Sequence, residues 1–277
     1  MYNVGKFLEF TGDKKVLGKY QLTREQTWNI AMAMGKVLLK NGAETSRVEE
    51  TITRFCRAND CGDINVFVTP TVIILGDENT NNTSQMCRIR WRSNNLSKIS
   101  IINNFSYNIA TWDKNYEETM DYLNDLLNRP PRYGRRLVCL GSAVASAFFA
   151  VMLGGSYHDF IAAFITGGLA MVFNKILSGY RMSAFWENAV AGVTIGLIAV
   201  FCTAFSSECN LENIIVGSLM PFLPGLAFTN GLRDYIAGDL ISGNCRTAEA
   251  LLFASSIAAG LAAALLAWHN WGWALWK

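Results

Sequence analysis

The sequence predicts an α-helical membrane protein with five transmembrane helices, one of them broken by a Pro-Pro-Gly pattern, and an N-terminal cytoplasmic α+β domain with a small antiparallel sheet. The main observation is a change in composition. Residues 1–136 hold most of the Lys, Arg, Asp and Glu, whereas residues 137–277 consist mostly of Ala, Gly, Leu, Ile and Phe. Such a change separates a soluble part from a membrane-embedded part. The second observation is that the apolar part divides into runs of the length that a bilayer requires.

The soluble part is expected to comprise a flexible segment at 1–22 and a folded domain at 23–136. Apolar residues spaced three and four apart predict helices, and apolar alternation predicts strands. The predicted elements are helices at about 23–40 and 46–60, strands at 64–75 and 85–91, and helices at 95–108 and 113–128. Pro70 interrupts the first strand, which is therefore expected to be bulged or to lie at an edge of the sheet.

A group of polar residues marks the junction between the first two predicted helices. Ser46 and Glu49 have the spacing of a capping box, and Asn41-Gly42 is expected to end the preceding helix. The motif residues are Gly42, Glu44, Thr45, Arg47 and Glu49, followed downstream by Thr69 and Pro70. They are interpreted either as a small-ligand site or pore gate, or as an ordinary helical hairpin with surface ion pairs.

Five apolar runs make up the second part, at about 137–154, 160–177, 185–205, 213–232 and 248–268. Lys and Arg fall at alternate ends of successive runs, beginning with the arginines at 129–136, as the positive-inside rule requires. We therefore expect a multi-pass protein of the inner (plasma) membrane, with its N-terminus in the cytoplasm and its C-terminus outside. The first residues lack the apolar core of a signal peptide, which agrees with this orientation.

The fourth run carries the main candidate site. A helix broken at membrane depth is tolerated where protein or a wet cavity satisfies the freed backbone groups, and half-helix ends favour anionic groups such as a carboxylate. Gly225 allows close approach, Thr229 and Asn230 offer hydrogen bonds, and two aspartates offer sites for an ammonium group or a proton. The candidate residues are Pro221, Pro224, Gly225, Thr229, Asn230, Asp234 and Asp239. The alternative places Asp234, Asp239 and Arg246 in a solvated cytoplasmic loop, paired with Arg233.

Several functional classes find no support in the sequence. The two histidines lie far apart and the seven cysteines form no C-x-x-C pair, so no metal site is expected. No P-loop, G-x-G-x-x-G or Ser/His/Asp arrangement occurs, so no cofactor and no catalytic residues are predicted. A net charge of +2 gives no indication of nucleic-acid binding. The cysteines are expected to be free thiols, with a disulfide between Cys202 and Cys209 as the alternative.

The number of spans and the small residues in them indicate a partner. Gly192 and Gly196 form a G-x-x-x-G pattern, which allows close packing of membrane helices within a chain or between chains. Many transporters consist of paired repeats, whereas five is an odd number and this chain holds no second copy of its own motif. We therefore infer a partner chain that supplies the missing half, and a homo-oligomer is the alternative.

Two motifs make the chain similar to the threonine/serine exporter family (ThrE-like). The first is Leu38-Leu-x-x-Gly-Ala-Glu-Thr-x-Arg-Val-Glu49 with Val68-Thr-Pro70. The second is Pro221-x-x-Pro-Gly225 with Asn230, Asp234, Gly238-Asp239, Ser242-Gly243 and Arg246. The resemblance covers most of residues 22–268, with both motifs in matching order, and it adds Ser242 and Arg246 to the candidate transport path.

The resemblance implies an exporter, not an enzyme, for small hydrophilic carboxylate-bearing metabolites such as threonine and serine or a dicarboxylate such as succinate. Full-length members have about ten spans, so the chain resembles the larger five-span subunit of the split two-component form, similar to paired-subunit succinate exporters. Its expected partners are the substrate, the lipid bilayer and a smaller multi-span membrane subunit of the same family. The alternative is a membrane-anchored sensor or hydrolase-like enzyme with its site in the N-terminal domain, at Glu44, Arg47 and Glu49.

Overall fold

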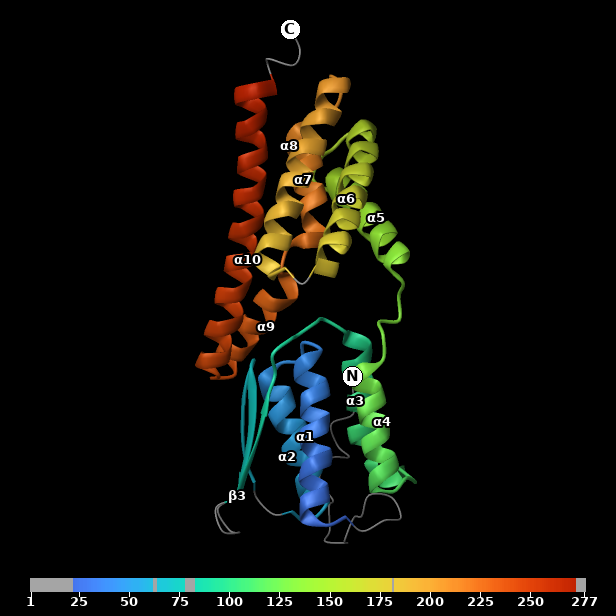
Figure 1. The fold of residues 1–277 in the computed structure, drawn as a ribbon, viewed down its shortest axis with the longest axis vertical. Coiled ribbons are helices and arrows are strands. Elements are labelled where there is room, and N and C mark those ends of the chain that lie inside the picture. The colour runs from blue at the N-terminus through green and yellow to red at the C-terminus, as the bar shows by residue number, and fades with distance from the viewer. Residues whose placement is uncertain (1–21, 62–63, 78–82, 181, 273–277) are drawn as a thin grey trace, which may run out of the picture. The chain divides into compact units, whose positions relative to one another are not determined.

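The computed structural model describes residues 22–61, 64–77, 83–180 and 182–272, which form mostly helices and one three-stranded sheet (Figure 1). The chain divides into two compact units. The first comprises residues 1–130 and 230–245, and the second comprises residues 131–229 and 246–277. A short segment from near the end of the chain therefore belongs to the same unit as the N-terminal residues.

Two capped helices open the first unit, α1 at Arg24–Lys40 and α2 at Thr45–Ala58. The Thr23 hydroxyl accepts a hydrogen bond from the backbone of Gln26, and the Gln26 side chain accepts one from the backbone of Thr23. This reciprocal pair is a capping box, which fixes the start of α1. The end of α1 at Asn41-Gly42 is confirmed, since Gly42 has a φ of 90° that glycine adopts readily.

The capping box expected at Ser46 and Glu49 is wrong. α2 begins at Thr45, and its N-cap residue Glu44 makes no capping hydrogen bond through its side chain. The Glu49 carboxylate instead accepts a hydrogen bond from the backbone N–H of Val68 at 2.8 Å. The Glu49 side chain, which the capping box requires, is therefore hydrogen-bonded to a residue distant in the sequence.

Three strands form an antiparallel sheet in the order β1-β2-β3, with bounds Asn65–Thr69, Val72–Asp77 and Thr83–Arg88. Thr69 pairs with Val72, so the chain reverses at Pro70 and Thr71. The single interrupted strand expected over 64–75 is therefore wrong. Pro70 occupies a two-residue hairpin turn, where its fixed φ and missing N–H are tolerated. The antiparallel pairing of the last strand is confirmed.

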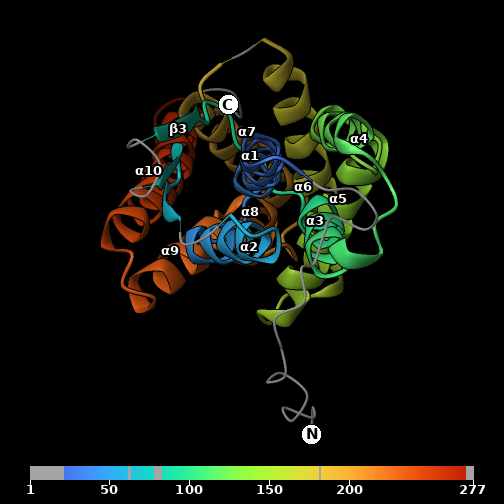
Figure 2. The same cartoon turned by 90° about the horizontal axis from the view of Figure 1, so that it is seen from below.

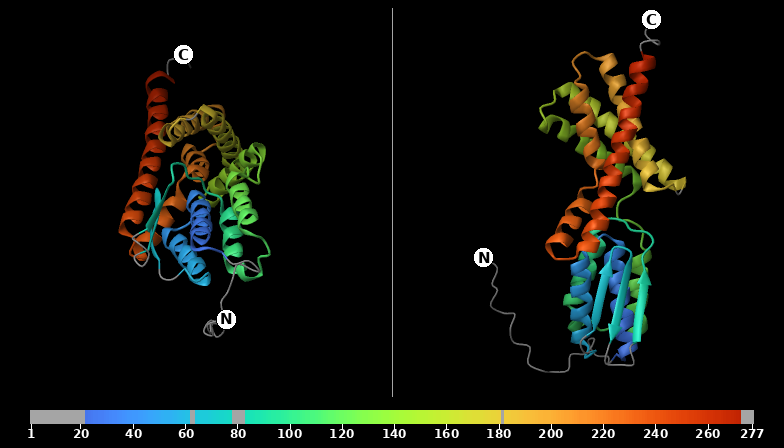
Figure 3. Two further views of the ribbon diagram at one scale, coloured as in Figure 1. Left: turned by 60° about the horizontal axis from the view of Figure 1, so that its bottom comes forward. Right: turned by 90° about the vertical axis from the view of Figure 1, so that its left-hand side faces the viewer.

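A hydrophobic core joins these helices to the sheet. The elements α3 (Leu96–Tyr107), η2 (Ile109–Thr111) and α4 (Tyr116–Asn128) complete the N-terminal part of the unit. α1 contacts α2, α3, α4 and β2, so it is the central helix in the view along its axis (Figure 2). The three strands lie side by side over the helices (Figure 3, right). Fully buried side chains at this interface include Met34, Leu38, Ile52 and Ile73.

The remaining elements are helical. They are α5 (Arg135–Met152), α6 (Tyr157–Leu177), η3 (Ser178–Tyr180), α7 (Ala184–Phe205), α8 (Leu211–Leu219), η4 (Met220–Phe222), α9 (Gly225–Ile236), α10 (Leu240–Ala267) and η5 (Trp268–Gly272). Four of the described helices, α5, α6, α7 and α10, are long and apolar enough to cross a membrane. The segments Leu211–Phe222 and Gly225–Ile236 are bent by 61° relative to each other and would together count as a fifth span.

The break in the fourth apolar run falls where the prolines predict it. Pro221 lies in η4, and Pro224 directly precedes α9. The next helix begins earlier than the expected span, at Leu240 rather than 248. The predicted start at 248 was based on hydropathy, which excludes the polar residues near 242–246 because they are not apolar, although they are helical. The connection between α9 and α10 is therefore short, and Gly238, with a φ of 90°, forms its turn.

Small residues allow close helix packing within the second unit. A Cβ atom added at Gly192 would overlap the backbone carbonyl of Ile257, and one added at Gly196 would press on the Ala264 side chain. The G-x-x-x-G pattern therefore packs α7 against α10 inside this chain, one of the two uses that the sequence left open.

Candidate functional site

The two sequence motifs meet in the first unit. The corner between α1 and α2, together with the end of β1, comes from the N-terminal residues. The end of α9, the turn at Gly238-Asp239 and the start of α10 come from residues 230–245. Hydrogen bonds and one ion pair join these segments, which are nearly 190 residues apart in the sequence.

Asp234, near the end of α9, makes the most buried of these contacts. Its Oδ1 accepts hydrogen bonds from the Thr45 hydroxyl at 2.8 Å and from the Thr45 backbone N–H at 3.3 Å. Thr45 is the first residue of α2, and the N-terminus of a helix favours a negative charge. Both residues are 0% exposed. The alternative of a solvated Asp234 in a loop is therefore wrong.

Asp239 shares the same hydroxyl. Its Oδ2 lies 3.3 Å from Thr45 Oγ1. A hydroxyl has one proton to donate, so the Thr45 side chain can satisfy only one of the two carboxylates at a time. The Thr45 hydroxyl therefore links Asp234 and Asp239 at one point.

Glu49 brings a third carboxylate to the same place. Burial raises the pKa of Glu49 above its ordinary value, and the negative charges of Asp239 and Asp234 raise it further. The hydrogen bond from the backbone N–H of Val68 acts in the opposite direction but is outweighed. We call Glu49, Asp234 and Asp239 the acidic cluster.

Further motif residues hold α9 against the α1–α2 corner. The Glu44 carboxylate forms an ion pair with Arg233 at 2.5 Å. The Asn230 side chain donates a hydrogen bond to the carbonyl oxygen of Gly42 at 3.0 Å. Arg233 therefore pairs with Glu44, a partner that the sequence did not indicate.

A cavity of about 870 Å³ lies beside the acidic cluster. It is bounded by α2, the start of β1 and the α9–α10 connection, and its wall includes Glu49 and Asp239. Arg54 and Arg57 line the same cavity. Small-molecule sites are commonly of this size and carry a few converging polar groups. The cavity therefore offers both carboxylates and guanidinium groups to a small charged molecule.

The other predicted site residues lie outside the acidic cluster. The helix break in the second unit is surrounded by Pro221, Pro224, Gly225 and Thr229. Arg246 lies on α10, and Arg47 is exposed on α2. The β1–β2 turn holds Thr69 and Pro70. The Thr229 hydroxyl donates to the carbonyl of Gly225 within its own helix at 2.9 Å. The Ser242 hydroxyl lies 3.5 Å from the carbonyl oxygen of Val68. Arg246 is 4% exposed, so its solvated-loop alternative is also wrong.

Sequence reasoning missed the arginines of the cavity and the backbone partner of Glu49. Glu50 and Arg54 are four residues apart and pair on one face of α2, which a search for helical ion pairs would have found. The Val68 backbone N–H carries no side-chain signal. In the described part of the chain, no group of three or more His, Cys, Asp or Glu side chains is arranged to hold a metal ion.

A broken apolar helix pair that carries a buried carboxylate near its end, with four further helices of membrane-spanning length, is typical of a multi-span membrane transport protein. The model of the family described as putative threonine/serine exporter matches residues 29–268. The chain therefore belongs to the threonine/serine exporter family, and the resemblance seen in its motifs is confirmed.

The relatives differ in length. The threonine/serine exporter of Corynebacterium glutamicum is 26% identical over 241 residues, which cover 84% of this chain and 49% of the relative. The probable succinate transporter subunit YjjP of Escherichia coli is 23% identical over 252 residues, covering 88% of this chain and 95% of the relative. The chain thus spans about half the length of the threonine/serine exporters that it matches. No solved structure matches it.

Proposed function

We propose that the chain is one membrane subunit of a secondary exporter for small hydrophilic carboxylate-bearing metabolites, with threonine and serine or a dicarboxylate such as succinate as substrates. The acidic cluster is the observation that carries the proposal, because it joins the end of a broken apolar helix to a cavity with both signs of charge. Carboxylates kept buried in a membrane transporter commonly belong to a substrate path or a proton relay.

The acidic cluster also suggests how export is driven. A proton or a substrate ammonium group would each relieve the repulsion among the three carboxylates, so the two compete for the same negative charge. Such competition makes proton binding and substrate binding thermodynamically coupled, which an exchanger requires. A dicarboxylate would instead bind through the guanidinium groups of Arg54 and Arg57 in the adjacent cavity.

A smaller multi-span partner subunit is part of the proposal. The Escherichia coli relative, which this chain covers almost completely, is named a transporter subunit, whereas the Corynebacterium glutamicum exporter is about twice as long. Within the four long apolar helices, only 28–33% of the most apolar window is buried inside the chain. Most of their apolar surface therefore remains for lipid and for a partner. A second copy of the same chain is the competing arrangement.

We further propose five spans, counting the bent pair as one, with the N-terminus in the cytoplasm and the C-terminus outside the plasma membrane. The alternation of Lys and Arg between successive apolar runs supports this orientation. It brings the acidic cluster to the cytoplasmic end of the fourth span, where an exported substrate would enter. Cysteine-accessibility or reporter-fusion mapping of both ends would test this orientation directly.

The alternative of a sensor or hydrolase-like enzyme at Glu44, Arg47 and Glu49 is less well supported. Glu44 is engaged by Arg233, Glu49 is engaged by the Val68 backbone, and Arg47 points to solvent. The first contact fixes α9 to the α1–α2 corner and the second fixes β1 to α2, so both carboxylates already have structural partners. The named relatives are transporters, which also favours the exporter.

Efflux from cells preloaded with threonine, serine or succinate tests the proposal. Deleting the gene should slow efflux of at least one substrate, and the wild-type chain should restore it. The Asp234→Asn and Asp239→Asn variants should insert normally but lose the dependence of efflux on external and internal pH. Asp121→Asn, which changes an exposed carboxylate on α4, is the matched control and should behave as wild type. Unchanged efflux of all three substrates after deletion would refute the exporter.

A further inference from the structure

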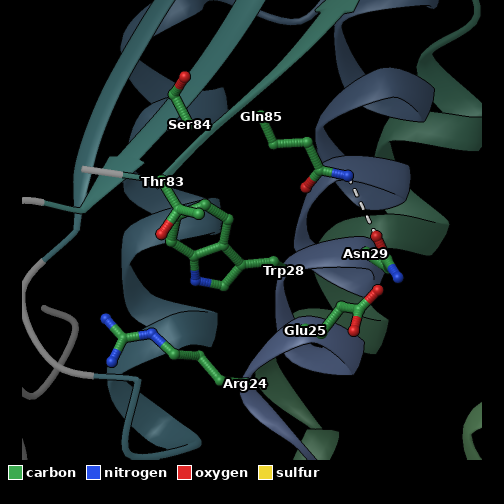
Figure 4. A pocket seen from close by; sticks show the side chains of 7 residues that line it. All are labelled: Arg24, Glu25, Trp28, Asn29, Thr83, Ser84 and Gln85. Carbon is green, nitrogen blue, oxygen red and sulfur yellow. Dashed lines mark hydrogen bonds between the residues drawn. The ribbon is translucent and has the colours of Figure 1, made fainter. Parts of the chain in front are cut away.

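A second cavity lies in the first unit between the start of α1 and the start of β3. Its volume is about 490 Å³, within the range of small-molecule sites. The lining side chains shown in Figure 4 are Arg24, Glu25, Trp28, Asn29, Thr83, Ser84 and Gln85. None of them belongs to either sequence motif, and the proposed export path does not use them.

One wall of this cavity holds an unsatisfied hydrogen-bond donor. Trp28 is 92% buried, as its exposed fraction is 8%. Its indole Nε1 has no hydrogen-bond partner among the described residues. In Figure 4 the nitrogen edge of the ring faces the space between Thr83 and Arg24. A buried donor without a partner is unfavourable, so a ligand acceptor at this point would relieve the penalty.

The opposite wall holds an unsatisfied acceptor. The Gln85 side chain donates through Nε2 to Asn29 Oδ1 at 3.1 Å, and Asn29 in turn donates through Nδ2 to the Tyr116 hydroxyl at 3.2 Å. This chain of amides fixes which end of Gln85 faces the cavity. Its Oε1 is buried there without a hydrogen-bond partner among the described residues (Figure 4). The cavity therefore offers a fixed donor and a fixed acceptor.

Two charged side chains, Arg24 and Glu25, also line the cavity. Arg24 forms an ion pair with the buried Asp77, which anchors the guanidinium, yet 40% of the Arg24 side chain stays exposed to further partners. Glu25 is exposed on the neighbouring position of α1. A carboxylate would suit Trp28 Nε1 and Arg24, and an ammonium group would suit Gln85 Oε1 and Glu25. The face of the Trp28 indole leaves an apolar surface for a short side chain.

We propose that this cavity is a binding site for a free α-amino acid, held by its carboxylate at Trp28 and Arg24 and by its ammonium group at Gln85 and Glu25. The site is separate from the acidic cluster. Trp28 and Gly42 are at opposite ends of α1, and the helical rise of about 1.5 Å per residue puts them roughly 20 Å apart. The inference rests on this cavity alone and stands whether or not the chain exports amino acids.

Calorimetric titration of the purified full chain in detergent micelles, with the standard L-amino acids as probes, tests the proposal. At least one probe should bind saturably, whereas its N-acetyl and carboxamide derivatives, each lacking one charge, should bind much more weakly. Trp28→Phe keeps an aromatic ring and removes the donor, and Gln85→Met keeps the length and removes the acceptor. Each should weaken binding by about three- to tenfold, the worth of one hydrogen bond.

Two controls make the result decisive. Trp91→Phe changes a tryptophan that is 77% exposed and lies outside the cavity, so it should leave the affinity unchanged. Asp234→Asn should also leave it unchanged, which separates this site from the export path. The proposal is overturned if no amino acid binds the wild-type chain, if the singly charged derivatives bind as tightly, or if both cavity variants keep wild-type affinity. Melting temperatures of both variants show that they are folded.

Discussion

Replacing Thr45 with Val removes one hydroxyl while keeping the shape of the side chain, so it isolates the hydrogen bond at the centre of the acidic cluster. The Thr45 hydroxyl lies 2.8 Å from Asp234 Oδ1, and both residues are 0% exposed. A hydrogen bond to a charged group contributes about 1.5–3 kcal/mol. The longer bond from the Thr45 backbone N–H, at 3.3 Å, remains in the variant. We therefore expect the free energy of unfolding to fall by about 2 kcal/mol.

A double-mutant cycle measures this contact without assuming its size. Thr45→Val, Asp234→Asn and the double variant would be unfolded in detergent micelles by denaturant and followed by circular dichroism. The charged acceptor makes the bond roughly twice as strong as a neutral one, so we expect a coupling energy of about 1 kcal/mol or more. Thr45→Ser keeps the hydroxyl and should keep most of the coupling. Single effects that add to within about 0.3–0.5 kcal/mol would show that the two side chains do not interact.

Three further predictions concern ionisation, packing and thiol reactivity. Because the pKa of Glu49 is raised in the folded state, its carboxyl stabilises the fold fully at a pH below its ordinary pKa of 4.5, and this contribution is lost as the pH rises through the folded-state pKa. When the melting temperature is measured against pH, Glu49→Gln should show a flatter curve over that range. Gly192→Ala should lower the melting temperature because its Cβ would meet the α10 backbone, whereas Gly141→Ala, with nothing within 4 Å, should not. Burial raises the pKa of Cys56 to about 12, so in mass spectrometry a maleimide should modify exposed Cys245 and leave Cys56 intact.

Local features of the fold were predictable because local chemistry sets them. The end of α1 follows from Gly42, whose backbone suits a left-handed turn, and the break before α9 follows from Pro224. Alternation of apolar residues continues on both sides of Pro70, so periodicity alone could not reveal that the chain reverses there. The early start of α10 was missed because hydropathy measures lipid preference and not helix formation.

The site residues were easier to predict than their partners. Both motifs contain residues that the structure brings together, yet Thr45 and Asp234 are separated by 189 positions, and no periodic pattern connects them. The role expected of Glu49 in a capping box failed because a backbone group from β1 competes for its carboxylate. Such long-range choices depend on which elements pack together, which a single sequence does not encode locally.

The free energies expected for two contacts indicate which of them holds α9 more firmly to the N-terminal helices. The Glu44–Arg233 pair is short, but 64% of the Arg233 side chain is exposed, and exposed ion pairs contribute about 0–1 kcal/mol. The Thr45–Asp234 bond is fully buried and cannot be exchanged for water, so breaking it costs more. A ligand or proton that competes for Asp234 would therefore act on a fully buried link between the two motifs. This makes the N-terminal domain part of the proposed transport cycle, because α2 would respond directly to the charge state of α9.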